Sequence, residues 1–222
     1  MFKKPQNVLI YLISFLLIGC KPIISGVIHD TTCSPPCWKS IIPGKTSREE
    51  AGNILKNSSE VKQNSIRTWS MVAADDSIGW EFLPRTGDRF GDILINNDIV
   101  FGFSFYPDKN GLSLKTAISY FGEPENIVAI NNNSEIPYLS IYLGYPSKGI
   151  VLWSSVTPYH MGEAVKISSD TIIEGFWYFE TNLYIQLMTS MYIANIDPKI
   201  LSQSTYPWPG YGDITKFIVK NK

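Results

Sequence analysis

The chain has 222 residues, with 19 lysines and arginines against 20 aspartates and glutamates, for a net charge of −1. This near-neutral balance excludes the broad basic surface that nucleic acids and anionic membranes attract, so we expect no nucleic-acid partner. Charged residues make up 18% of the chain and aromatic residues 13%, which excludes a disordered chain and favours a packed core.

The N-terminus has the pattern of an export signal. Lys3 and Lys4 precede an apolar run, Val8–Ile18, which is too short to span a membrane comfortably. The tetrad Leu17–Cys20 resembles the lipobox of bacterial lipoproteins, which implies cleavage before Cys20 and attachment of fatty acids to its thiol. We therefore expect a lipoprotein at the cell membrane or outer membrane, anchored through Cys20 on the extracytoplasmic face. An uncleaved membrane anchor is the alternative.

Two further cysteines, Cys33 and Cys37, lie in the segment CSPPCW. Disulfides persist outside the cytoplasm, so we predict a local disulfide between them. A metal site that adds His29 is an alternative, although it lacks a fourth ligand, and free thiols are another.

The first helix signal follows a proline-rich tether at residues 20–40. Ser47 and Glu50 form a capping-box pattern, and Ala51 begins an apolar helical face. Short β-rich runs separated by turn residues then predict strands. They lie at Ile66–Ala73, Gly79–Leu83, Asp92–Ile95 and Val100–Tyr106, with turns that include Asp75–Asp76. In the last run, the alternation predicts one aromatic face formed by Phe101, Phe103 and Phe105.

The same order of elements then recurs. Ser113 is the predicted N-cap of a second helix that ends at Gly122, and four strand-like runs follow it. They are Ile127–Ile130, Tyr138–Gly144, Ile150–Ser155 and Ile172–Phe179. Beyond them, Leu183–Met191 is either a strand or a buried helix, and a short helix is predicted from Pro198 to Gln203.

We therefore predict an α+β fold with two repeated helix-plus-antiparallel-sheet units and a C-terminal extension. Ser47 aligns with Ser113 and Ala51 with Ala117, although few other residues are identical. The predicted boundaries are a signal peptide at 1–19, a tether at 20–40, a first unit at 41–108, a second unit at 109–180, and an extension at 181–222 packed on the second unit.

Two segments resemble a known family. Ile42–Leu55 and Leu114–Pro124 are similar to the glycine-containing turn, helix and Gly-x-Pro helix end of the SmpA/OmlA (BamE) type of outer-membrane lipoprotein. Two such units in one exported chain resemble the architecture of β-lactamase inhibitory protein. The first unit departs from the pattern, because Lys56 to Ser58 stand where the Gly-x-Pro would be. The resemblance implies a protein-binding or structural role in the envelope, without naming a partner or binding residues.

The sequence has no hydrolase, metalloprotease or nucleotide-binding motif, so we predict no cofactor, no metal site and no catalysis. A Ser-His-Asp triad would have to use His160, with Ser154 and Asp170 nearby in sequence, and we interpret His160 as a surface residue. The acidic pairs Asp75–Asp76 and Glu123 with Glu125 are interpreted as turn and helix-end residues.

The aromatic residues give the remaining functional clue. Six tryptophans are spread over the chain, and core packing is the simplest reason for them. We expect one exposed aromatic surface in the turn that carries Tyr206, Trp208 and Tyr211, because its prolines stiffen it. The predicted function is non-catalytic binding of another envelope protein at the membrane surface. Binding of a sugar or cell-wall ligand through exposed aromatic rings is the alternative, and a hydrolase is the third.

Overall fold

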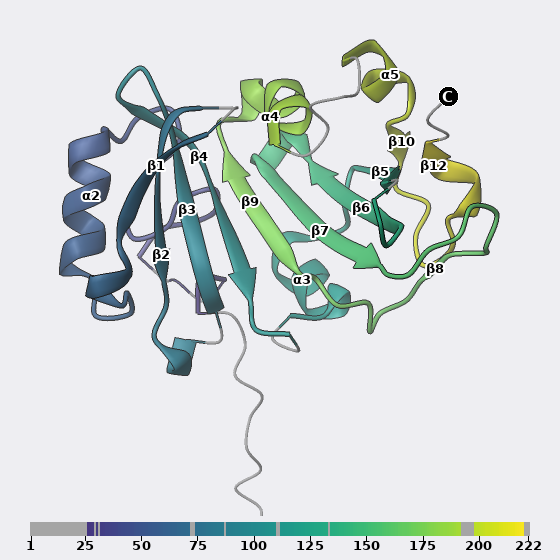
Figure 1. Cartoon of the computed structure of the whole chain (residues 1–222), viewed down its shortest axis with the longest axis horizontal. Helices are drawn as coiled ribbons and strands as arrows, with labels where there is room; N and C mark the ends of the chain where they lie inside the picture. The colour runs from purple at the N-terminus through teal and green to yellow at the C-terminus, as the bar shows by residue number, and fades with distance from the viewer. Residues whose placement is uncertain are drawn as a thin grey trace, which may run out of the picture.

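A computed structural model describes residues 26–28, 30, 32–71, 74–86, 88–109, 112–132, 134–191 and 198–219. Within these ranges the chain forms one 10-stranded sheet with helices on both faces (Figure 1). The longer helices are α2 (Arg48–Asn57), α3 (Leu114–Phe121), α4 (Tyr184–Met191) and α5 (Pro198–Gln203). No helix of the described ranges is long and apolar enough to cross a membrane.

The strands of the sheet lie in the order β1-β2-β3-β4-β9-β7-β6-β5-β10, and β12 also pairs with β5. Their bounds are β1 Arg67–Met71, β2 Ala74–Glu81, β3 Asp88–Asn96, β4 Ile99–Pro107, β5 Asn126–Asn132, β6 Tyr138–Tyr145, β7 Ile150–Val156, β9 Gly175–Phe179, β10 Tyr206–Pro207 and β12 Ile218–Val219. All these pairs are antiparallel except β12 with β5. A separate pair joins β8 (Lys166–Ile167) to β11 (Gly212–Asp213).

The prediction of two repeated helix-plus-sheet units is wrong, because both sets of strands belong to one continuous sheet. Strand β9 joins them: it pairs with β4 on one side and with β7 on the other. All five residues of β9 are buried, and a strand with apolar side chains on both faces needs a central position with a partner at each edge. The C-terminal segment also extends this sheet, since β10 and β12 pair with β5.

The helix starts follow the local sequence. The Ser47 side chain accepts a hydrogen bond from the Glu50 backbone, and the Glu50 carboxylate accepts one from the Ser47 backbone, which confirms the predicted capping box of α2. Ser113 caps α3 in a similar way, and Gly122 ends that helix at a φ of 79° that favours glycine. The predicted turn at Asp75–Asp76 is wrong, because both residues lie inside β2.

One face of the sheet packs against α2, α3 and the N-terminal segment. Its core includes Ala51, Leu55, Ala117, Phe103 and Phe105. The described part of the segment predicted as a tether also enters this core. Val27 and Ile28 are buried there, and Trp38 is 1% exposed and stacks on Trp80 with ring centroids 5.5 Å apart.

The opposite face has a second, smaller core beneath α4 and α5. Tyr184, Leu187, Met188 and Leu201 pack there on β5, β6, β7 and β9. Phe101 belongs to this core, so the prediction that it shares a face with Phe103 and Phe105 is wrong. The reason is a bulge: Leu94 pairs with Gly102 and Ile95 with Val100, which leaves Phe101 as an extra residue that turns to the other face.

Candidate functional site

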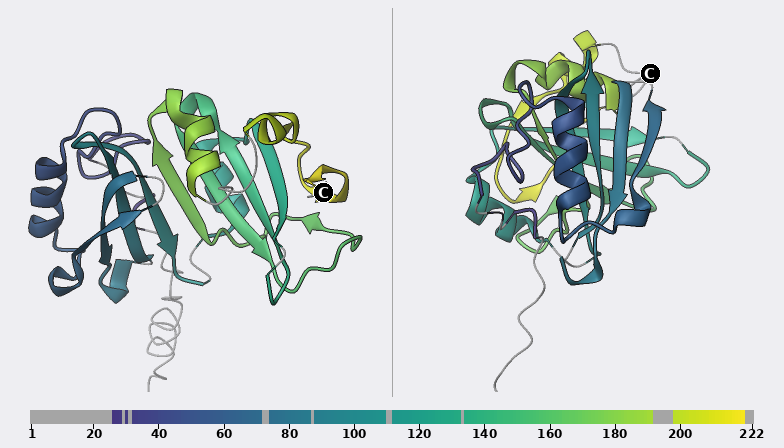
Figure 2. Two further views of the ribbon diagram at one scale, coloured as in Figure 1. Left: turned by 45° about the horizontal axis from the view of Figure 1, so that its top comes forward. Right: turned by 90° about the vertical axis from the view of Figure 1, so that its left-hand side faces the viewer.

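On this second face, Leu94 of β3 and Phe101 of β4 belong to the core beneath α4 and α5, and the rest of β1–β4 carries no helix among the described residues. Figure 2 shows α4 over the β9 to β5 half, whereas α2 stands beside the β1–β4 half. We call this uncovered part the open face and define it by Trp69, Glu81, Phe90, Asp92 and Tyr106, which come from β1, β2, β3 and β4. The antiparallel register places these residues on one face of the sheet.

The most prominent side chain of the open face is Trp69, which is 41% exposed. Its indole lies across Gly79 of the neighbouring strand. A Cβ atom at Gly79 would lie 1.9 Å from Cη2 of Trp69 and 2.6 Å from Oδ1 of Asp92. Only glycine leaves room for both groups, so Gly79 lets the ring lie against the sheet beside the carboxylate.

Asp92 stands in the middle of β3, between Gly79 on β2 and Ser104 on β4. Burial raises the pKa of its carboxyl from an ordinary value of 3.8 to about 6. Among the described residues, its one hydrogen-bond partner is the Ser104 hydroxyl, which donates across 3.4 Å. Asp92 is therefore a largely buried carboxylate with a single long hydrogen bond, which is an unfavourable arrangement for the charged form.

The nearby basic residues serve another carboxylate. Lys62 donates to Glu81 at 2.7 Å, and this hydrogen bond is the main cause that lowers the pKa of Glu81, with a smaller contribution from the charge of Arg67. No ion pair within the described ranges involves Asp92. The open face thus has a carboxylate for which the described residues supply no counter-ion, beside an exposed indole.

A row of aromatic rings borders Asp92. Phe90, which is 37% exposed, stacks on Tyr106 with ring centroids 4.2 Å apart. Tyr106 in turn meets Trp177 edge to face at 6.2 Å. These contacts fix the orientation of the rings, so the surface around Asp92 is preorganised.

The structure places the sequence-predicted residues elsewhere. A disulfide joins Cys33 to Cys37, with their Cα atoms 5.7 Å apart, beside the buried Trp38. Cys20 and His29 lie outside the described residues. Groups of histidine, cysteine and acidic residues that would hold a metal ion are absent from the described ranges.

The aromatic turn near the C-terminus is only partly exposed. Tyr206 and Tyr211 are 36% and 48% exposed, whereas Trp208 is partly buried and donates its indole N–H to Glu123 at 2.6 Å. Trp208 therefore holds the turn against the end of α3, and the two tyrosines remain as an exposed aromatic surface. Glu125 accepts from the Ser147 backbone at 3.1 Å, so this acidic pair has a structural role.

The described residues form no Ser-His-Asp triad. His160 is exposed, and its backbone N–H donates to Glu163 at 3.2 Å. Ser154 is buried in β7, and Asp170 accepts from its neighbour Ser169. No hydrogen bond joins His160 to either residue within the described part of the chain.

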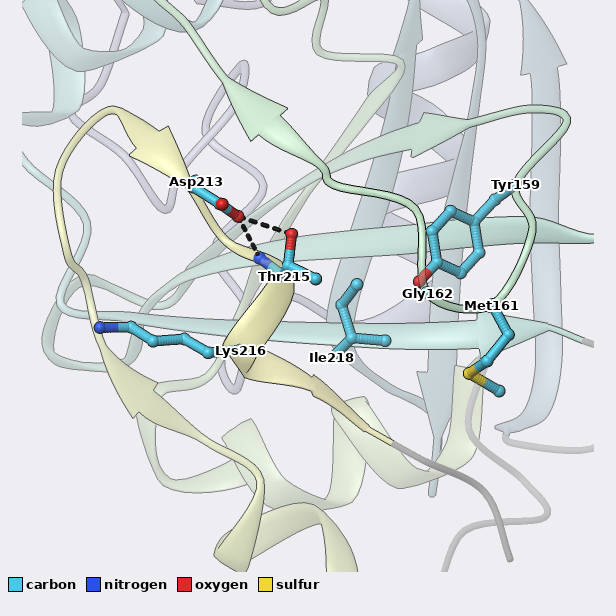
Figure 3. Close-up of a pocket in the computed structure, with 7 residues that line it drawn as sticks. All are labelled: Tyr159, Met161, Gly162, Asp213, Thr215, Lys216 and Ile218. Atoms are coloured by element: carbon cyan, nitrogen blue, oxygen red, sulfur yellow. Dashed lines mark hydrogen bonds between the residues drawn. The ribbon is translucent and has the colours of Figure 1, made fainter.

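A pocket of about 640 Å³ lies beside β12 (Figure 3). It is lined by Tyr159, Met161, Gly162, Asp213, Thr215, Lys216 and Ile218. Its carboxylate is already engaged, because Asp213 accepts from the Thr215 backbone at 2.8 Å and from the Thr215 hydroxyl. These hydrogen bonds are the main cause that lowers the pKa of Asp213. The carboxylate of this pocket is therefore already satisfied within the protein, unlike that of Asp92.

Sequence reasoning missed the pairing of Trp69 with Asp92. Trp69 is one of six tryptophans, and nothing local distinguishes it from those of the core. Asp92 carries the stronger signal, since an acidic residue inside a strand of apolar neighbours is costly unless it has a partner. The register of three strands was needed to bring the two together.

Comparison with protein-family models, with curated proteins and with solved structures found no match for this chain.

Proposed function

We propose that this protein is a non-catalytic, lipid-anchored protein of the cell envelope that binds another protein through the open face. The observation that carries the proposal is the exposed indole of Trp69 beside the carboxylate of Asp92, on a part of the sheet that no described helix covers. Tryptophan and tyrosine rings held at a preorganised surface are typical of the residues that dominate protein interfaces.

The anchor rests on the sequence. Leu17–Cys20 supplies the lipobox-like tetrad, and acyl chains on Cys20 would contribute about 0.8 kcal/mol per buried CH₂ to membrane attachment. The resemblance to SmpA/OmlA-type lipoproteins supports the same location. Metabolic labelling with an alkyne fatty acid tests this part: wild type should be labelled and Cys20→Ala should not. Equal labelling of both would refute the anchor.

Binding rather than catalysis is supported by the chemistry of the open face. Its one perturbed carboxylate, Asp92, has no histidine, cysteine or lysine among its hydrogen-bond partners within the described residues. A catalytic site would combine such a carboxylate with a nucleophile, a second acid or base, or a metal ion at the reacting atom. The Asp92 carboxylate, with one long hydrogen bond and the exposed ring of Trp69 beside it, is better suited to binding a hydrogen-bond donor of a partner than to catalysis.

Sugar binding is the second candidate, and the exposed indole of Trp69 beside Asp92 favours it. A pyranose ring presents an apolar C–H face that stacks on indoles, and its hydroxyls would donate to Asp92. A protein partner fits the site better, because no described residue gives Asp92 a counter-ion and a neutral sugar would not supply one.

Site-specific photo-crosslinking in intact cells tests the choice. A photoreactive phenylalanine analogue replaces Phe90 on the open face or, as the control, Tyr120 on α3, which is 45% exposed. We expect a discrete crosslinked protein from position 90 and none from position 120. The same products from both positions, or no product from position 90, would contradict protein binding at this face.

A further inference from the structure

We propose that Asp92 and Trp69 together form a receptor site for an arginine side chain of the partner protein. This inference rests on the proposed function and specifies its chemistry. The site is built from three adjacent strands: Trp69 on β1, Gly79 on β2 and Asp92 on β3.

Charge complementarity identifies the occupant. Asp92 needs hydrogen-bond donors and a positive charge, because Ser104 gives it a single long hydrogen bond and no described cation pairs with it. The surrounding charged groups do not fill this need. Lys62 pairs with Glu81, and the charge of Arg67 acts on Glu81 as well. The Arg89 guanidinium lies over the Phe90 ring, and its Nε–H donates to the Pro107 carbonyl. Tyr106 of β4 is stacked on Phe90. The missing charge must come from outside the described residues.

Arginine fits better than lysine. A guanidinium group is planar, so it can lie on the exposed indole of Trp69 and still direct paired N–H groups at a carboxylate. The indole and the carboxylate approach the same point above Gly79, which places both contacts within reach of one such group. An ammonium group would satisfy the charge but not the planar stacking.

Selective NMR detection of the Asp92 carboxyl tests the inference on the full chain in detergent. The protein carries ¹³Cγ-aspartate, and Asp92→Asn assigns the signal. The apparent pKa of Asp92 is measured with no addition, with arginine amide, and with citrulline amide at matched ionic strength. Citrulline has the same shape without the charge. Methyl glucoside serves as the sugar probe.

We expect arginine amide at millimolar concentration to lower the apparent pKa of Asp92 by about half a unit or more, and citrulline amide to leave it unchanged. Trp69→Ala and Gly79→Ala should each reduce this response several-fold, the second because its methyl group displaces the indole without removing it. Tyr211→Ala, remote from β1–β3, should respond like wild type. Unchanged signals from the other aspartates show that each variant is folded.

Equal effects of arginine amide and citrulline amide, or a response to methyl glucoside alone, would overturn the arginine site. Its failure is distinguishable from failure of the proposed function. If position 90 still crosslinks to a protein while arginine amide has no effect on Asp92, the interface stands and its arginine chemistry does not. If arginine amide acts but no crosslink forms, the site stands and the proposed protein partner does not.

Discussion

Replacing Asp92 with asparagine should stabilise the protein at neutral pH. The raised pKa of Asp92 means that folding disfavours its charged form. The shift from 3.8 to about 6 corresponds to about 3 kcal/mol at 1.36 kcal/mol per unit, which is an upper value because water reaches part of this surface. Asparagine has nearly the same shape and carries no charge, so we expect Asp92→Asn to gain about 1–3 kcal/mol at pH 8.

The pH dependence provides the sharper part of this prediction. Between about pH 4 and 6 the folded protein binds more protons at Asp92 than the unfolded chain does, so this group lowers the free energy of unfolding as pH rises. The advantage of Asp92→Asn should therefore be near zero at pH 4 and complete above pH 6. Urea unfolding of the full chain in mild detergent at both pH values measures it.

Asp213→Asn is the matched control. Hydrogen bonds from Thr215 lower the pKa of Asp213, so its charged form is favoured by folding and its removal should destabilise rather than stabilise at pH 8. The reasoning about Asp92 would be refuted if Asp92→Asn were no more stable than wild type at pH 8, or if its advantage were equally large at pH 4.

Three further predictions concern the scaffold, and urea unfolding measures each. Trp38→Ala should cost about 3–5 kcal/mol, because a fully buried ring stacked on Trp80 is lost; a cost below about 1 kcal/mol would contradict its place in the core. Cys33→Ser should lower the free energy of unfolding by about 2 kcal/mol, the chain-entropy value for so short a loop. A reductant should lower the stability of wild type to that of the variant and leave the stability of the variant unchanged. Ser47→Ala should cost about 1 kcal/mol through loss of the α2 cap, whereas Ser47→Asp should retain most of the stabilisation that the cap provides.

Local signals in the sequence predicted most elements of the fold. The capping pattern of Ser47 and Glu50 placed the start of α2, and Ser113 with Gly122 placed α3. Short strand-like runs located β4, β6 and β7 to within one or two residues. These signals depend on neighbouring residues alone, so they are readable without knowledge of the tertiary structure.

The arrangement of the strands could not be predicted in the same way. The continuous apolar run Phe176–Phe179 is the signature of a strand buried on both faces, but it does not say which strands flank it. The pairing of β9 with β4 joins residues about seventy positions apart and fuses the two predicted units. The bulge at Phe101 depends on the register with Leu94, which local alternation does not reveal.

The candidate site was hidden for the same reason. Trp69, Gly79 and Asp92 lie on three strands, and each is unremarkable in its own segment. The aromatic turn with Tyr206 and Tyr211 was visible in the sequence because its rings are close together along the chain. Proximity in sequence therefore led to the prediction of the turn as the binding surface. The folded sheet instead brings the Asp92 carboxylate, with its single long hydrogen bond, beside the exposed ring of Trp69 on the open face.

If the partner captured by crosslinking at position 90 binds at the open face, substitution of Trp69 should weaken its binding. If it binds at the aromatic turn, substitution of Tyr211 should do so instead. The most direct measurement is the Kd of that purified partner for wild type, Trp69→Ala and Tyr211→Ala, by isothermal titration calorimetry. We expect Trp69→Ala to weaken binding at least about tenfold, as at an interface hot spot, and Tyr211→Ala to bind like wild type. Full affinity in Trp69→Ala, or a loss confined to Tyr211→Ala, would contradict binding at the open face.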